Sequence, residues 1–475
     1  MDWNTFIYYF SYLYPTVLIM GLFCAFDVIM KGRSSQGVIA WSLCLIIFPF
    51  ITVPFYLVFG GRKYHGYVKA RRKDESKLKN TGTLFLSKVG DFITSGDEAW
   101  KKALENIAKL PVTKGNKVEV LVDGNAKFTA LMEALEKAEK YILFQYYMVR
   151  DDKTGQSVKE LLLKKASSGV KVYFLYDAIG SYELSKKYLK ELLAGGVKVA
   201  QFGSYRFVKN KFQLNFRNHR KIVVIDGQTA FCGGLNIGDE YKGLDPKLSP
   251  WRDTHMKILG PGALCVQVVF LEDWFSMVGE EPEGLCWDAK ECGNNEVLLL
   301  PTGPADELDT CTLSFITACN SAKEKLWMTS PYFVPSKEVS SALEAAVQRG
   351  VDVRVIVPDK ADNLIVQMSS QCFIDSVSKH GVKFYRYKEG FLHEKVMLVD
   401  DHIAVVGTAN LDNRSFSLNF ELMAYSFDTE TVSSVYRMLE RDFENSEEIP
   451  VDEFSQRPFM YQLIAKIYSL GAPLQ

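Results

Sequence analysis

Several features are scarce in this chain of 475 residues, and each absence excludes a class of protein. The nine cysteines form no Cys-x-x-Cys pair, so neither a disulfide framework nor a zinc site is expected, and reduced thiols in a cytosolic compartment are favoured. The formal net charge of −1 provides no overall basic field for nucleic acid. The opening MDWNTF lacks the positive charge of a signal peptide, and the sequence contains no phosphate-binding loop. No metal and no cofactor are therefore expected.

Acidic and basic residues are nearly missing from the first sixty positions. The stretch Thr5–Val28 contains only Asp27, and Ser34–Gly61 contains none. Each stretch exceeds the roughly 20 apolar residues that a helix needs to cross a bilayer. A buried core helix is the alternative, but two such stretches joined by a short turn favour a transmembrane hairpin over residues 1–61. We expect its helices at about 5–28 and 37–60.

Basic residues beside these stretches predict how the hairpin is oriented. The turn contains Lys31 and Arg33, whereas the exit segment contains Arg62, Lys63, Lys69, Arg71, Arg72 and Lys73. Positive residues stay on the inner side, so both termini are expected there. We expect residues 62–115 to form a basic juxtamembrane linker and helix that can contact an anionic lipid bilayer, although a solvated charge run would look the same.

Scarce histidines recur in a duplicated motif. Five residues in RNHRKIVVIDGQTAFCGGLN return 174 positions later: His219 and His393, Lys221 and Lys395, Asp226 and Asp400, Gly233 and Gly407, Asn236 and Asn410. Helical patterns that end at a glycine and lead into β-branched stretches surround both copies, which is typical of βαβ units. The prediction is two similar α/β domains at 116–290 and 291–448, with the boundary inside 279–295, followed by an amphipathic tail at 449–475.

Each copy of the motif brings a histidine and a lysine together. On a strand, residues i and i+2 point to the same face, so His219 lies beside Lys221 and His393 beside Lys395. A neighbouring ammonium lowers the pKa of an imidazole and offers a charge to a phosphate oxygen. Two such pairs facing each other across a pseudo-twofold interface would form one metal-free site for a phosphodiester.

The motif pair resembles the phospholipase D superfamily. The segments WRDTHMKILG and LHEKVMLVDDHIAVVGTANLDNRSFSLNFE, together with the amino-terminal hairpin, narrow the resemblance to bacterial cardiolipin synthases. That resemblance implies two phospholipase D-like α/β sandwich domains at the inner face of a bacterial plasma membrane. The superfamily often has serine after the motif glycine, where this chain has Gly234 and Thr408.

The resemblance also implies roles for the site residues. His219 would attack the phosphorus of phosphatidylglycerol, and His393 would act as acid and then base, although the sequence itself is symmetric between them. Lys221, Lys395, Asn236 and Asn410 would bind phosphate oxygens, Asp253 and Glu421 would orient the imidazoles, and Asp226 and Asp400 would complete the catalytic motif as structural supports at its edge.

Three alternatives remain open. The same phosphohistidine could be discharged by water, which would make the protein a hydrolytic phospholipase D. Asp253 could merely pair with Arg252 or a surface lysine. The apolar stripe in the tail, at residues such as Phe459, Leu463 and Ile467, could lie on a bilayer or on the protein, and ordinary packing is favoured.

Overall fold

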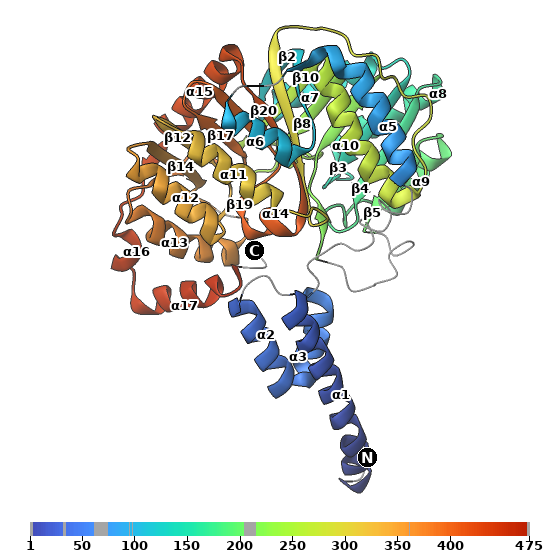
Figure 1. Ribbon diagram of the computed structural model, residues 1–475. Helices are drawn as coiled ribbons and strands as arrows, with labels where there is room; N and C mark the ends of the chain where they lie inside the picture. Colours follow the sequence, from blue (N-terminus) through green and yellow to red (C-terminus); the bar gives the residue numbers. More distant parts are fainter. Residues whose placement is uncertain are drawn as a thin grey trace. The chain divides into compact units, whose positions relative to one another are not determined.

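The computed structural model describes residues 3–31, 35–60, 75–94, 96, 98–203, 215–360 and 362–472. Arg33 and the basic residues 62–73, on which the predicted orientation of the hairpin depends, lie outside the described residues. The chain divides into two compact units (Figure 1). One comprises residues 1–66 with 205–216, and the other comprises residues 67–204 with 217–475.

The described residues of the first unit form three helices, where the sequence predicts two. They are α1 (Trp3–Lys31), α2 (Ser35–Ile47) and α3 (Pro49–Phe59). The second predicted helix is broken at Phe48, because Pro49 begins α3 at a position where a missing N–H is tolerated. Asp27, the single acidic residue of the first stretch, accepts a hydrogen bond of 2.8 Å from the Tyr56 hydroxyl.

Two helical stretches are long and apolar enough to cross a membrane, among the residues described. Tyr12–Met30 in α1 has a mean hydropathy of 1.9, and little of it is buried. Pro261–Val278 in the second unit passes the same test, but it is mostly buried and serves as a core helix.

The second unit begins with α5 (Glu75–Val89) and α6 (Ala99–Ala108) and continues as two similar halves. The first half contains β2 (Val112–Val122), α7 (Asp123–Glu136), β3 (Tyr141–Tyr146), α8 (Lys153–Ser167), β4 (Lys171–Asp177), α9 (Lys186–Ala194), β5 (Lys198–Phe202), β6 (Arg217–Asn218), β7 (Ile222–Ile225), β8 (Thr229–Gly233), β9 (Trp251–Arg252), β10 (Thr254–Leu259) and α10 (Pro261–Val278).

The second half repeats this order. It contains β11 (Asn295–Thr302), α11 (Thr310–Ser321), β12 (Lys325–Thr329), β13 (Phe333–Val334), α12 (Lys337–Gln348), β14 (Asp352–Pro358), α13 (Leu364–Ser378), β15 (Lys383–Tyr387), β16 (Phe391–Leu392), β17 (Val396–Val399), β18 (Ile403–Gly407), β19 (Leu411–Asp412), α14 (Asn413–Ser417), β20 (Asn419–Ser426) and α15 (Thr429–Glu444). The chain closes with β21 (Ser446–Glu448), α16 (Glu453–Gln456) and α17 (Phe459–Ser469).

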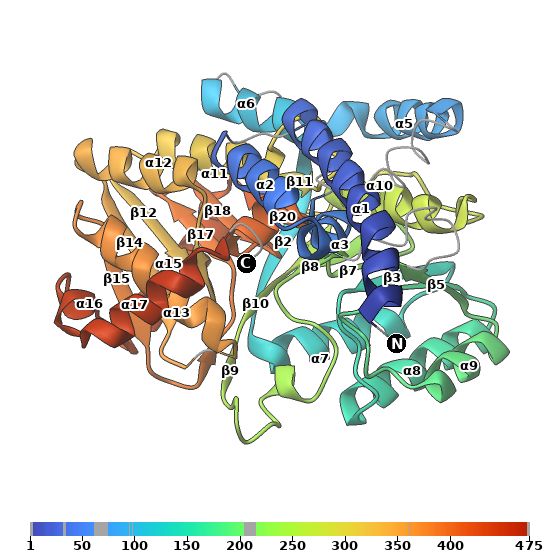
Figure 2. The same ribbon diagram turned by 90° about the horizontal axis from the view of Figure 1, so that it is seen from below.

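The strands of each half form a sheet with the same strand order, and the two sheets join at their edges. The first half pairs in the order β5-β4-β3-β7-β8-β10-β2, and the second in the order β15-β14-β12-β17-β18-β20-β11. Antiparallel pairing of β2 with β11 connects them. Helices cover the sheets (Figure 2), and the apolar strands β7 and β17 are buried along their whole length, as expected for strands with both faces covered. The predicted mixed α/β fold with a duplicated domain is therefore confirmed.

Two short parallel pairs link the halves where the motifs lie. The strand β6, just before His219, pairs with the start of β20, and β16, just before His393, pairs with β9. The predicted boundary segment 279–295 lies between α10 and β11. Both motifs are thus brought to the junction between the halves.

Candidate active site

The backbone places each motif histidine against a strand of the opposite half. The His219 N–H donates to the carbonyl of Phe420 at 2.9 Å, and the His393 N–H donates to the carbonyl of Arg252 at 2.8 Å. In both cases the accepting residue immediately precedes an acidic residue, Glu421 or Asp253. These matched bonds fix how closely each imidazole can approach that carboxylate.

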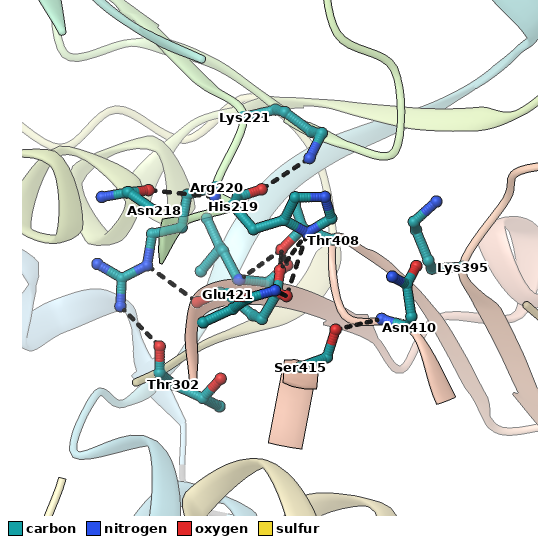
Figure 3. Close-up of polar contacts among 12 residues, drawn as sticks. Asn218, His219, Arg220, Lys221, Thr302, Lys395, Thr408, Asn410, Ser415 and Glu421 are labelled. Carbon is teal, nitrogen blue, oxygen red and sulfur yellow. Dashed lines mark hydrogen bonds and ion pairs between the residues drawn. The ribbon is translucent and has the colours of Figure 1, made fainter. Parts of the chain in front are cut away.

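Each histidine contacts a carboxylate that belongs to the other half. His219 Nδ1 lies 2.9 Å from Glu421 Oε2, and His393 Nδ1 lies 2.8 Å from Asp253 Oδ2. Both carboxylates are completely buried. Because Nδ1 is engaged, Nε2 is the nitrogen of each ring that can face a substrate, and that of His393 lies 3.2 Å from Lys395 Nζ. Figure 3 shows Glu421 beneath the His219 ring.

The motif lysines lie beside the histidines as the spacing predicts. Lys221 Nζ donates to the His219 carbonyl at 2.7 Å, and Lys395 Nζ lies 2.9 Å from His393 Nδ1 while also donating to the His393 carbonyl. Figure 3 shows Lys395, from the second half, near the His219 ring of the first. The positive charge of Lys395 lowers the pKa of both His219 and Lys221, so the two motifs belong to one electrostatic site.

Burial makes this site hold neutral imidazoles next to ionised carboxylates. Burial lowers the pKa of His219 to about 4, although Glu421 opposes the shift. Burial and the Lys395 ammonium also lower the pKa of His393. Burial alone would raise the pKa of Glu421, but His219, the Lys221 ammonium and the Thr408 hydroxyl together outweigh it and lower the pKa. Burial further lowers the pKa of Lys221 to about 7 and that of Lys395 to about 8.

The two halves differ at the residue after the motif glycine. The Thr408 hydroxyl donates to Glu421 Oε2 at 2.6 Å and accepts from the Leu422 N–H at 2.9 Å. At the equivalent position, a Cβ on Gly234 would lie only 1.9 Å from Asp253 Oδ1. The first half therefore needs glycine so that the Asp253 carboxylate can occupy the space, whereas the second half uses a hydroxyl to hold Glu421.

The predicted phosphate-binding asparagines are buried and bonded within their own halves. The Asn236 amide accepts from the Met148 N–H at 3.2 Å and donates to the Tyr241 hydroxyl at 3.0 Å. The Asn410 amide donates to Asp412 Oδ2 at 3.2 Å, while its oxygen is buried without a hydrogen-bond partner. These contacts order both asparagines, and their binding of phosphate stays a prediction.

Asp226 and Asp400 do not face the histidines. Each follows the far end of its strand, has a positive φ, and accepts three backbone N–H bonds of 2.8–2.9 Å. The donors are the N–H groups of residues 139–141 for Asp226 and residues 323–325 for Asp400. These carboxylates tie β7 to the start of β3 and β17 to the start of β12, so their direct role is to support the strands that carry the site.

Sequence reasoning missed a second set of buried charges behind the histidines. Arg220 donates from Nη1 to Asp273 Oδ1 at 2.8 Å. It also donates from Nε to the Glu421 carbonyl at 2.9 Å (Figure 3). On the other side, Arg252 donates to Asp442 Oδ2 at 2.7 Å and lies 3.2 Å from Glu394 Oε2. Arg220 and Glu394 occupy equivalent positions in the two motifs, 174 residues apart, so the sequence contained a trace of these charges. A search for identical residues does not find this pair, because the two charges are opposite.

His255 is two residues beyond Asp253 and fully buried, and neither ring nitrogen has a hydrogen-bond partner. Within the part of the chain that the structure describes, no cluster of three or more histidine, cysteine or acidic side chains could hold a metal ion.

A duplicated α/β domain whose two His-x-Lys motifs meet at the junction defines the phospholipase D class. A family model described as "Cardiolipin synthase, PLD-like domain" matches residues 131–243 and 315–444, and one described as "Phospholipase_D-nuclease N-terminal" matches residues 19–61. The chain is 41% identical over 479 residues to cardiolipin synthase A of Pseudomonas putida W619, covering 100% of both chains. It is 41% identical to that of Pseudomonas syringae pv. syringae B728a, covering 98% of each. The chain belongs to the cardiolipin synthase family and is an enzyme of the phosphatidyltransferase class.

A solved structure supports the same fold. Phosphatidylserine synthase of Haemophilus influenzae Rd KW20 matches 80% of this chain and 100% of its own, with a TM-score of 0.60 and 14% identity. At that identity the match concerns the fold alone.

Proposed function

We propose that this chain transfers a phosphatidyl group from one phosphatidylglycerol molecule to another and forms cardiolipin and glycerol through a phosphohistidine. The observation that carries the proposal is the pair of imidazoles, each engaged at Nδ1 by a buried carboxylate of the other half, which leaves Nε2 of each ring to meet the phosphodiester, beside Lys395 in the case of His393. Nucleophilic catalysis of this kind divides one difficult displacement into two easier ones.

In the first step, His219 Nε2 attacks the phosphorus of the donor and forms a P–N bond. The P–O bond to the departing glycerol breaks, and His393 gives that glycerol oxygen its proton. In the second step, a glycerol hydroxyl of the acceptor loses its proton to His393 and attacks phosphorus, and the P–N bond breaks. The anionic phosphodiester between the two rings offsets the burial that otherwise disfavours protonated His393.

Lys221 and Lys395 would stabilise the charge on the non-bridging oxygens, together with Asn236 and Asn410. Asp253 and Glu421 would hold the imidazoles in the tautomer that presents Nε2, as the acidic member of a serine-protease triad does for its histidine. No cofactor takes part, because one phosphodiester replaces another.

The competing function is hydrolysis, in which water discharges the phosphohistidine and phosphatidic acid is released. Purified protein supplied with phosphatidylglycerol alone separates the two. Cardiolipin and glycerol in equal amounts support the proposal, whereas phosphatidic acid as the main product contradicts it.

We further propose that residues 1–61 form a membrane hairpin, with both termini and the domains at 116–290 and 291–448 on the cytoplasmic side of a bacterial plasma membrane. The apolar stretch Tyr12–Met30 and the family match over residues 19–61 support membrane association. A membrane-impermeant reagent that labels a tag at either terminus in intact spheroplasts would contradict this topology.

A further inference from the structure

The helix α17 carries two apolar faces, only one of which is covered by the protein. Ala465 and the partly buried rings of Tyr461 and Tyr468 pack against Met368 of α13. A second face exposes six large apolar side chains: Phe459, Met460, Leu463, Ile464, Ile467 and Leu470. A continuous exposed apolar face of this kind is uncommon on a surface that only meets water.

The exposed face continues onto α13 toward the active site. Leu364 and Ile365, in the first turn of α13, are also exposed, and Met368 follows one turn later under α17. Figure 2 shows α17 running alongside α13. The residue Asp362, just before this turn, accepts a hydrogen bond of 2.7 Å from Tyr332, which leads into β13, and β13 pairs with β19 directly after Asn410. Burial lowers the pKa of His393 and Lys395, and the negative charge of Asp362 partly opposes that shift.

The first half has a matching exposed apolar pair at the equivalent place. Ile179 and Tyr182 follow the carboxyl end of β4, as Leu364 and Ile365 follow that of β14. The Asp177 carboxylate accepts from the Ile179 N–H at 2.9 Å and from the Asn218 N–H at 3.0 Å, next to His219. Exposed apolar side chains therefore flank the catalytic histidines from both halves.

We propose that this apolar rim, made of Ile179, Tyr182, Leu364, Ile365 and the exposed face of α17, inserts into the acyl region of a phospholipid monolayer and presses the active site against the headgroups. An amphipathic helix binds a membrane interface in this way through its apolar face. The inference rests on the proposed function, because a lipid substrate must reach both histidines from the bilayer.

A bilayer is favoured over a protein partner for two reasons. The chain itself carries an apolar helical stretch of membrane-crossing length, Tyr12–Met30, and the rim surrounds a site that takes lipid. The exposed ammonium groups of Lys360 and Lys466 border the apolar side chains and suit anionic headgroups.

The test uses the full chain and two forms of phosphatidylglycerol. Ile467→Ser removes a rim side chain that is 55% exposed, and Leu193→Ser removes a matched leucine, 56% exposed, at the end of α9 before β5, away from the strand ends that carry the rim. We expect Ile467→Ser to lower turnover of phosphatidylglycerol vesicles by about tenfold, and the double variant F459S/I467S by more, because burying each such side chain strengthens partition by about that factor. Turnover of monomeric dihexanoyl-phosphatidylglycerol should not change, and Leu193→Ser should change neither.

A direct measurement accompanies the activities. The full chain is reconstituted in vesicles with brominated acyl chains, and the fluorescence added by each new tryptophan is measured relative to the unsubstituted chain. The fluorescence added by Ile467→Trp should be quenched, and that added by Leu193→Trp should not. Three results would contradict membrane insertion of the rim: equal loss of turnover on both substrates, an altered oligomeric state of Ile467→Ser, or equal quenching at both positions. If the unsubstituted chain forms no cardiolipin from either substrate, the proposed function fails instead, and the quenching result still decides whether the rim enters lipid.

Discussion

In the first half of the catalytic unit, the residue between the motif histidine and lysine is Arg220, and in the second half it is Glu394. Arg220 pairs with Asp273 on α10, whereas Glu394 lies against Arg252, which comes from the opposite half and pairs with Asp442 on α15. Both arrangements bury a guanidinium beside a helix carboxylate and a cross-domain strand. Breaking a buried pair of this kind leaves an uncompensated charge, so neither side can change one partner alone.

The same comparison extends to the carboxylates that contact the histidines. Glu421 is held by the Thr408 hydroxyl, whereas Asp253 fills the space left by Gly234 and accepts from its neighbouring Thr254 N–H at 2.8 Å. A chemical cycle in which one histidine is nucleophile and the other is acid and base does not require equal surroundings. If the two halves have these separate roles, equivalent substitutions in each half should affect catalysis differently.

The largest expected difference is between the two histidines. His219→Ala should lower turnover by about 10⁴-fold or more and abolish the labelled phosphoenzyme, since the attacking group is lost. His393→Ala should lower turnover similarly but leave a slowly formed phosphoenzyme at His219 that accumulates. The measurement is labelling with phosphatidylglycerol carrying ³²P, quenched with detergent at neutral to alkaline pH because the P–N bond is labile in acid. A phosphoenzyme that persists in His219→Ala and vanishes in His393→Ala would reverse the assignment.

The second largest difference is expected when each carboxylate that contacts a histidine is replaced by the corresponding amide. Glu421→Gln should slow phosphoenzyme formation, because it removes the carboxylate on the nucleophile His219. Asp253→Asn should slow both formation and discharge, because it removes the carboxylate on His393, which is the acid in the first step and the base in the second. Each loss should be about 10²- to 10⁴-fold, the range for an acidic residue that orients a catalytic imidazole. Single-turnover kinetics check both steps, and an Asp253→Asn variant that discharges the phosphoenzyme at the unsubstituted rate would refute the crossed arrangement.

The pH dependence reports the two lysines. Their pKa values of about 7 and about 8 mean that the ammonium charges are lost as the pH rises through that range, whereas His219, with a pKa of about 4, stays neutral from pH 5 upward. We therefore expect kcat/KM, which reports the free enzyme, to fall on the acid side only near pH 4 and to fall more steeply than tenfold per unit above pH 8, because both ammonium charges and the proton of His393, whose pKa is also lowered, are then lost. A profile that stays flat to pH 10 would exclude charged lysines from the essential state.

A smaller effect is expected at the residue where the halves differ. Thr408→Val should lower turnover by about tenfold, the value of one hydrogen bond to a charged group, while Thr408→Ser should retain the hydroxyl and the rate. Gly234→Ala should displace the Asp253 carboxylate from His393 and slow both formation and discharge of the phosphoenzyme. If Thr408→Val and Thr408→Ser behave alike, the hydroxyl does not hold Glu421.

The smallest effect on catalysis is expected at the motif aspartates. Asp226→Ala should leave three backbone N–H groups without their acceptor and lower the free energy of unfolding by about 1–3 kcal/mol, with turnover per folded molecule nearly unchanged. Denaturant unfolding and active-site titration by phosphoenzyme labelling measure the two quantities separately. A 10³-fold loss of turnover at unchanged stability would return Asp226 to the catalytic residues.

Much of this arrangement could be predicted from the sequence, because the duplicated motif is local. The offset of 174 residues and the runs IVVI and VMLV predict both buried strands, and residue spacing predicts each His–Lys pair. The pairing of each histidine with the carboxylate of the opposite half was not predictable in the same way, because it depends on the parallel pairs β6·β20 and β16·β9. Spacing along one chain carries no information on such long-range contacts.

Other features were hidden for local reasons. The break at Phe48 follows from one proline in an apolar run that composition alone describes as continuous. The uncovered face of α17 was hidden because both of its faces are apolar, and a helical stripe does not reveal which residues the protein covers.

Because His219 contacts Glu421 and His393 contacts Asp253, each histidine and its carboxylate come from different halves of the chain. Consider a chimera that joins the first half of this chain to the second half of a relative. It should be active only if β6, which begins at residue 217, and β16, which begins at residue 391, pair with strands of matching length and charge. The two halves are therefore expected to evolve together. Recombination inside the 279–295 segment should yield folded but inactive proteins whenever the two parents differ at the contacts between the halves.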